Sequence, residues 1–383
     1  MKTTYITDVA SFLPNEPVSN DATEEILGMI NGRPSRSRNI ILRNNGIKSR
    51  HYAIDRKTGR YTHNNASLTA EAVRTLLDKS GTRPVEVGCL CCGTSSPDQI
   101  KPGHGSMVHG ELTWPPCEVM SAAGVCASGM TAMKYAHMSV AAGFAMKAVC
   151  TGSEFISSFM RASNFEPEIQ ARIEALEKKP VLGFEKDFLR WMLSDGAGAA
   201  LIAPQPNHDR ISLRIDWIDI RSFAGDLPVC MYTGAVKRGD GSLQGWREAA
   251  NPEDVLRRSY FAIKQDARIL DEYIVSVAVE RALLPMAKQY GLTPDMVTWY
   301  LPHYSSEYFR GPLHDMMKSR GFYVPYERWF TNLLEKGNTG AASIYIILEE
   351  MISSGKLKKG DTLLCMVPES GRFTICYAHM TVV

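Results

Sequence analysis

A run of small residues around Cys126 constrains the fold of this chain more than any other stretch. It reads Glu118-Val-Met-Ser-Ala-Ala-Gly-Val-Cys126-Ala-Ser-Gly-Met-Thr-Ala-Met133. The residues before Gly124 predict a short buried strand, and the alanines and spaced methionines after Cys126 predict a buried helix. Glycines at 124 and 129 let other backbone or a ligand come close. The stretch therefore predicts a strand, a turn and a buried helix that begins at Cys126.

A cysteine in this place has two interpretations. The positive end of a helix dipole favours the thiolate, so we expect the pKa of Cys126 to be lowered and the residue to be a nucleophile. Taken alone, a buried structural cysteine is the more common case. The rest of the chain has to decide between them.

Length and charge exclude several classes of protein. The 383 residues are too many for one simple core, which predicts two domains or two fused halves. A net charge of +2 gives no bulk attraction to nucleic acid or to an anionic membrane. The sequence shows no secretory signal and no apolar run of membrane-spanning length, so we read its nine cysteines as reduced thiols of a cytoplasmic protein.

Strands and helices alternate on both sides of Pro204-Gln-Pro-Asn-His208, which we take as a boundary. Residues 1–204 carry one strand that leads into Cys126, and residues 205–383 carry another that stops at Pro302-His303. This similarity predicts two halves of one architecture, packed together with the functional site at their junction.

Two charged stretches interrupt the pattern. Phe155 to Leu193 is amphipathic and helical, which predicts an insertion or lid in the first half. Glu253 to Gln289 reads as mostly helix and carries a basic group at Arg257, Arg258, Lys264 and Arg268. Such a group either contacts an acidic carrier protein or is simply a solvated helix face.

Three polar residues at the starts of predicted elements carry the chemistry: Cys126, His303 and Asn338. A nucleophilic cysteine needs a base or an imidazole nearby. Imidazole and amide groups together stabilise negative charge that develops on an oxygen. Each residue also has a structural interpretation, since His303 follows a strand and Asn338 lies in a Gly-Asn-Thr-Gly turn that caps a helix.

Several short motifs occur in one order along the chain. They are Gly46-Ile-x-x-Arg50-His, Ser96-Pro-Asp98, Gly124-Val-Cys126-Ala-Ser-Gly129, Gly152-Ser-Glu154, Asp195-Gly-Ala-Gly-Ala, Pro302-His303-Tyr and Gly337-Asn338-Thr-Gly-Ala-Ala-Ser343. Each motif is weak alone, but the ordered set resembles the thiolase superfamily, and within it the ketoacyl-acyl carrier protein synthase III branch. The set runs from about residue 40 to the C-terminus, so it covers nearly the whole chain.

The resemblance implies an α/β thiolase-like fold of two similar βαβαβαββ halves in five layers, assembled as a homodimer. It implies that Cys126 takes an acyl group from a thioester of coenzyme A or acyl carrier protein. His303 and Asn338 would then stabilise the enolate of the second substrate. The backbone N–H groups of Cys126 and Gly371 would form the oxyanion hole. No metal or cofactor is expected.

Three departures from the family pattern narrow the expectation. His303-Tyr-Ser-Ser306 replaces the usual His-Gln-Ala-Asn, Ser370-Gly371-Arg372 replaces a glycine triplet, and the insertion after Phe155 is long. These features are more similar to ketosynthase/cyclases that join two β-ketoacyl-type thioesters into cyclohexanediones, the precursors of dialkylresorcinols. Ring closure needs a base, and Glu154 is our candidate; its alternative is a purely structural carboxylate.

Other functions fit less well. A metal site would have to use Cys89, Cys91, Cys92, His104 and His109, whose spacing lacks a paired C-x-x-C. A degradative thiolase would carry a cysteine in the final loop, which reads Pro368-Glu-Ser-Gly371. A malonyl-using synthase, a Cys-His-Asn thioester hydrolase and a non-catalytic protein that binds acyl carriers stay open. The sequence holds no nicotinamide, flavin or nucleotide motif.

Overall fold

A computed structural model describes residues 2–165 and 188–383. Its largest element is a nine-stranded sheet in the order β13-β14-β15-β8-β1-β7-β6-β4-β5. The strands are β1 (Tyr5–Phe12), β4 (Cys89–Thr94), β5 (Glu118–Ala123), β6 (Ala148–Glu154), β7 (Gly196–Ala203), β8 (Leu213–Ser222), β13 (Trp299–Pro302), β14 (Thr362–Glu369) and β15 (Thr374–Val382). Small two-stranded ribbons pair β2 (Val18–Ser19) with β3 (Ser49–Arg50), β9 (Met231–Tyr232) with β12 (Lys264–Gln265), and β10 (Ala235–Lys237) with β11 (Leu243–Gly245).

The large sheet repeats one pattern on either side of the pair formed by β1 and β8. On the side of β1, β1 pairs antiparallel with β7, β7 pairs antiparallel with β6, and β6 pairs parallel with β4. On the side of β8, β8 pairs antiparallel with β15, β15 pairs antiparallel with β14, and β14 pairs parallel with β13. The predicted α/β fold of two similar halves is therefore confirmed.

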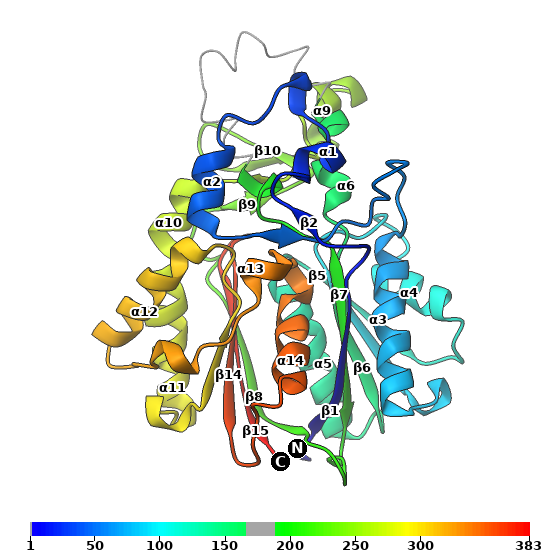
Figure 1. The fold of residues 1–383 in the computed structure, drawn as a ribbon, viewed down its shortest axis with the longest axis vertical. Helices are drawn as coiled ribbons and strands as arrows, with labels where there is room; N and C mark the ends of the chain where they lie inside the picture. The colour runs from blue at the N-terminus through cyan, green and yellow to red at the C-terminus, as the bar shows by residue number, and fades with distance from the viewer. Residues whose placement is uncertain (1, 166–187) are drawn as a thin grey trace.

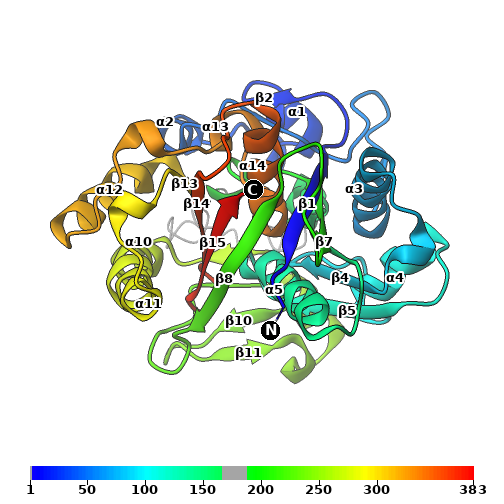
Figure 2. The same ribbon diagram turned by 90° about the horizontal axis from the view of Figure 1, so that it is seen from below.

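The curved sheet encloses two central helices and is covered by others, which makes five layers (Figures 1 and 2). Inside lie α5 (Ala127–Ala142) and α14 (Ser343–Ser353); outside lie α3 (Asn65–Ser80) and α4 (His104–Leu112) on the first half, and α10 (Ala267–Ser276), α11 (Leu284–Tyr290) and α12 (Arg310–Ser319) on the second. Met130, Met133 and most alanines of α5 are buried because both sheet halves pack on the helix, whereas Met138 on its outer face is exposed. In the described part of the chain, no helix has the length and apolar character that crossing a membrane requires.

Shorter helices surround the open end of the sandwich: α1 (Thr23–Leu27), α2 (Arg38–Asn45), α6 (Ser157–Met160), α9 (Pro252–Arg257) and α13 (Leu333–Lys336). Of the predicted insertion at 155–193, the structure describes α6, a 3-10 turn at Ala162–Asn164 and residues from 188 onward. The remainder lies outside the described residues.

The prediction of one basic helical stretch is wrong. Arg257 ends α9, Lys264 belongs to β12 and Arg268 lies on α10. Lys264 is buried, and its Nζ donates to the carbonyl of Ala235 at 3.1 Å. The helical stretch is interrupted at β12, where this buried lysine donates to backbone carbonyls, so no continuous cationic helix face forms.

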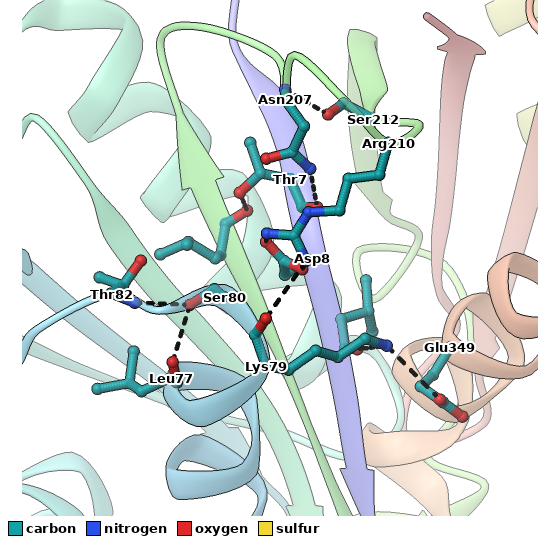
Figure 3. A network of polar contacts seen from close by, with 12 residues as sticks. Thr7, Asp8, Leu77, Lys79, Ser80, Thr82, Asn207, Arg210, Ser212 and Glu349 are labelled. Carbon is teal, nitrogen blue, oxygen red and sulfur yellow. Dashed lines mark hydrogen bonds and ion pairs between the residues drawn. The ribbon is translucent and has the colours of Figure 1, made fainter.

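The connection from β7 to β8, which contains the predicted boundary at 204/205, is fixed to the first half by polar contacts (Figure 3). Arg210 forms a 2.7 Å ion pair with Asp8 of β1. The Asn207 side chain donates to the Thr7 carbonyl at 2.7 Å, and Lys79 at the end of α3 donates to the Val9 carbonyl at 3.0 Å. These contacts fasten the connection and the end of α3 to β1, close to where β1 pairs with β8.

Candidate active site

A pocket opens where the two halves meet, at the N-terminal end of α5. Cys126 and Glu154 from the first half line it together with His303 and Asn338 from the second. The empty space of the pocket, including the open solvent at its mouth, is about 780 Å³. The rest of its wall is largely apolar and includes Leu189, Leu193, Leu270, Ile274, Ala278, Phe309 and Leu313.

Cys126 is the N-cap residue of α5, as the sequence predicted, and its side chain is buried. The expectation of a lowered thiol pKa is wrong for this environment. Burial raises the pKa of Cys126, and the carboxylates of Glu154 and Glu369 raise it further. Desolvation and two negative charges outweigh the helix dipole because both disfavour the thiolate. At rest the residue is a neutral thiol.

Glu369, the last residue of β14, is a member of the site that our sequence analysis missed. Its Oε2 accepts hydrogen bonds from the backbone N–H of Val125 at 2.9 Å and of Ala127 at 3.2 Å. Burial raises the pKa of Glu369, while these two N–H donors favour the charged form. The sequence signal was slight: one carboxylate in the loop Pro368-Glu-Ser-Gly371.

His303 follows directly on β13. Its backbone N–H donates to the Met366 carbonyl of the neighbouring strand β14 at 2.8 Å, which places the side chain at the end of the sheet. The ring is buried, and burial lowers its pKa to about 4. His303 is therefore a neutral imidazole at neutral pH and has one nitrogen that accepts a proton and one that donates.

Asn338 is held by its backbone and by its side-chain oxygen. Its N–H donates to the Met192 carbonyl, and its own carbonyl accepts from Ser194, both at 2.9 Å. Its Oδ1 accepts from the N–H of Gly340 at 2.9 Å. Among the described residues the Nδ2 group has no hydrogen-bond partner, so this donor stays available to a ligand in the pocket.

Two glycines allow the loop that carries Asn338 to reach α5. A Cβ atom at Gly129 or Gly152 would lie 2.2 or 2.0 Å from the carbonyl oxygen of Ala341, closer than real atoms come. The close backbone approach that the sequence predicted at Gly129 is therefore present. It brings the segments of Cys126 and Asn338 into contact although they belong to different halves.

Glu154 ends β6 and is buried beside the pocket. Its carboxylate accepts from the hydroxyls of Ser95 at 2.6 Å and Ser96 at 2.7 Å, and from the N–H of Ala341 at 3.0 Å. Burial raises its pKa to about 7 in spite of these hydrogen bonds. The group is thus well anchored, and it keeps its proton to a higher pH than an ordinary carboxyl does.

Gly371 lies in the turn between β14 and β15 and does not line the pocket, whereas its neighbour Ser370 does. Its carbonyl accepts from the N–H groups of Cys230 at 3.0 Å and Met231 at 3.3 Å. The predicted role of its N–H in an oxyanion hole stays a prediction.

No group of three or more side chains able to hold a metal ion occurs in residues 2–165 and 188–383. The cysteines of the disfavoured metal site lie inside the protein: Cys89 and Cys91 are fully buried on β4, with their sulfur atoms 3.4 Å apart.

Comparisons of the sequence and of the structure with known proteins agree with one another. The family of 3-oxoacyl-[acyl-carrier-protein] synthase III C-terminal domains matches residues 286–372. A β-ketoacyl-[acyl-carrier-protein] synthase III of Sphingopyxis alaskensis is 25% identical over 371 residues, which are 95% of this chain and 94% of that protein. OleA of Xanthomonas campestris, in a variant crystallised with lauric acid and lauroyl-CoA, matches with a TM-score of 0.74 at 18% identity over 99% of both chains. AbyA1, a tetronic acid condensing enzyme, matches with 0.73 at 19% over 99% of this chain and 100% of its own.

Proposed function

Because this chain is a thiolase-superfamily protein of the ketoacyl-acyl carrier protein synthase III-like type, we propose that it is a condensing enzyme that joins two acyl thioesters through a new carbon–carbon bond. The observation that carries the proposal is the shared pocket of Cys126, His303 and Asn338. The relatives of known activity are ketoacyl synthases, so an acyltransferase-type condensation is the reaction class.

In the first step the Cys126 sulfur attacks the carbonyl carbon of an acyl thioester. The new carbon–sulfur bond replaces the bond to the carrier, which leaves as a thiol with the proton of Cys126. His303 is neutral and accepts that proton in transit. The N–H of Cys126, with that of Gly371, would bind the oxygen of the tetrahedral intermediate.

In the second step the α-carbon of another thioester loses a proton to a base, or carbon dioxide in the case of a malonyl thioester, and the resulting enolate attacks the carbonyl carbon of the acyl-enzyme. The enolate oxygen would accept hydrogen bonds from the His303 ring and from the Nδ2 group of Asn338, the donor that no other described residue uses. The carbon–carbon bond forms as the carbon–sulfur bond breaks, and Cys126 takes up a proton. Two donors in a largely apolar pocket stabilise the enolate more than water would.

The finer proposal is that the second substrate is a β-ketoacyl thioester and that the product closes to a cyclohexanedione, a dialkylresorcinol precursor. The α-carbon between two carbonyls loses its proton to a base without decarboxylation. Ring closure would then form a second carbon–carbon bond at the remaining thioester carbonyl, and the carrier would leave as a thiol. Glu154 supports ring closure because a carboxyl with a pKa of about 7 accepts and donates protons near neutral pH. The alternative is a malonyl-using initiation synthase, in which Glu154 has only a structural role.

Two further alternatives use the same pocket. A Cys-His-Asn hydrolase would release the acyl group to water, and a non-catalytic carrier-binding protein would never form an acyl-enzyme. The largely apolar wall favours condensation over hydrolysis because it keeps water away from the acyl-enzyme.

We also propose acyl thioesters of coenzyme A or acyl carrier protein as partners, and a homodimer. The sheet ends at β5, whose outer edge has no strand beside it in the described residues. An unpaired edge with exposed backbone is suited to pairing with a second copy. The cytoplasmic location stays a prediction.

Intact-protein mass spectrometry tests the function. The protein is mixed with a medium-chain acyl thioester and then with a β-ketoacyl carrier thioester, and the products are analysed. An adduct on Cys126 that disappears as a 1,3-cyclohexanedione forms supports the finer proposal, and a linear β-keto product supports only the synthase. Free acid as the sole product would favour the hydrolase, and absence of any adduct would exclude Cys126 as the nucleophile.

A further inference from the structure

The carboxylate of Glu369 lies at the N-terminus of the helix that carries Cys126, although the two belong to opposite halves. Its Oε2 accepts from Val125 and Ala127, the residues on either side of Cys126. Among the described residues no backbone carbonyl accepts from the N–H of Cys126, which faces only its own sulfur. One carboxylate oxygen therefore takes two of the three successive donors and leaves the middle one without another residue as acceptor.

Two glycines leave room for this carboxylate. A Cβ at Gly124 would lie 3.2 Å from Oε2 of Glu369, and a Cβ at Gly371 would lie 3.3 Å from Oε1. Both distances are tighter than ordinary contact, so a larger residue at either position would press on the carboxylate. Gly371, whose N–H the resemblance places in the oxyanion hole, and Gly124 thus also accommodate the carboxylate of Glu369.

We propose that Glu369 is a positioning residue for the nucleophile. It fixes the backbone around Cys126 so that only the Cys126 N–H is left for the thioester oxygen, and its negative charge keeps the thiol protonated until a substrate enters. The free protein then resists alkylation and oxidation at Cys126, and loading depends on the proton acceptor His303. This inference rests on the proposed function only in taking Cys126 as the nucleophile.

Other groups also face the thiol. Glu154 approaches from β6, His303 from the end of β13 and Cys376 from β15. Glu154 repels the thiolate as Glu369 does, and His303 is neutral. The test therefore changes one charge and leaves the others in place. Glu369→Gln does this, because its amide oxygen still accepts from Val125 and Ala127.

The experiment measures the rate at which iodoacetamide alkylates Cys126 between pH 6 and 9, read by peptide mass spectrometry. Loss of a nearby negative charge lowers the pKa of a thiol by about one unit, which raises the thiolate fraction about tenfold at each pH below that pKa. Cys126 in Glu369→Gln is therefore expected to be alkylated about tenfold faster than in the wild type. Glu71→Gln on α3, a half-buried carboxylate paired with Arg74 and not among the residues that line the pocket, is the matched control and should react like the wild type.

An unchanged rate in Glu369→Gln would overturn the electrostatic role, and a slower rate would make Glu369 a base for the thiol instead. If the glutamine variant fails to fold, Glu369→Ala removes the same charge and must also accelerate alkylation. No thioester is used, so a protein without condensing activity still gives a clear answer.

Discussion

The hydroxyl of Tyr345 donates a 2.8 Å hydrogen bond to the carbonyl of Gly129. Tyr345 lies on α14 and Gly129 on α5, so this bond joins the two central helices, one from each half. Gly129 is only three residues from Cys126. The position of the thiol relative to the Asn338 loop therefore depends on how the two central helices pack.

Replacing Tyr345 with phenylalanine tests this link. The change removes one buried hydrogen bond and should lower the free energy of unfolding by about 1 kcal/mol. Urea unfolding measures it as a lower midpoint with an unchanged slope. Tyr323→Phe, at a residue with 44% of its surface exposed, is the control and should change stability by less than about 0.5 kcal/mol. Equal stability of both variants would show that the link contributes nothing.

The close approach at Gly152 predicts a large effect from one methyl group. In Gly152→Ala the new Cβ would lie 2.0 Å from the Ala341 carbonyl oxygen and 2.6 Å from its carbon. Because backbone must move, we expect a loss of roughly 3 kcal/mol or more in stability, together with loss of condensation. Thermal and urea unfolding check the first effect, and product formation the second.

The matched control for that variant is Gly110→Ala in α4, where a Cβ would meet nothing within 4 Å. An alanine inside a helix should leave stability equal or raise it by about 0.5–1 kcal/mol. Similar losses in the two variants would contradict the packing explanation.

Much of this site could be predicted because its signals are local. Small residues after Cys126 specify a helix start, and Pro302 ends the strand before His303, so both side chains could be placed at the ends of elements. The hydrogen bond from Val125 to Glu369 joins residues 244 positions apart, and no local pattern encodes it. The thiol pKa was predicted in the wrong direction for the same reason. The helix dipole is visible in the sequence, whereas burial and the two carboxylates arise only when the halves pack together.

The assigned roles predict that loading and condensation can be separated. Asn338→Ala removes an enolate donor but nothing that loading needs, so acyl-enzyme should form at a near-normal rate while condensation falls about a hundredfold. His303→Ala removes the proton acceptor as well and should slow both steps. Single-turnover mass spectrometry with an acyl thioester, and then with the second substrate, gives the two rates.

Asn251→Ala, at the exposed cap of α9, serves as the control and should behave like the wild type in both steps. If Asn338→Ala slowed loading as strongly as condensation, its proposed role at the enolate would be wrong.

The raised pKa of Glu154 predicts how stability changes with pH. The folded protein holds this proton up to about pH 7, while the unfolded chain releases it near the ordinary value of 4.5. Between these pH values the folded state binds more protons, so its stability falls as pH rises, by an order of about 3 kcal/mol. Glu154→Gln cannot lose a proton and should escape this fall. Its stability relative to the wild type should therefore increase between pH 5 and pH 8, measured by urea unfolding at each pH.

The control variant Glu71→Gln should follow the wild type at every pH. A constant difference in stability between Glu154→Gln and the wild type would show that Glu154 titrates alike in the folded and unfolded chains.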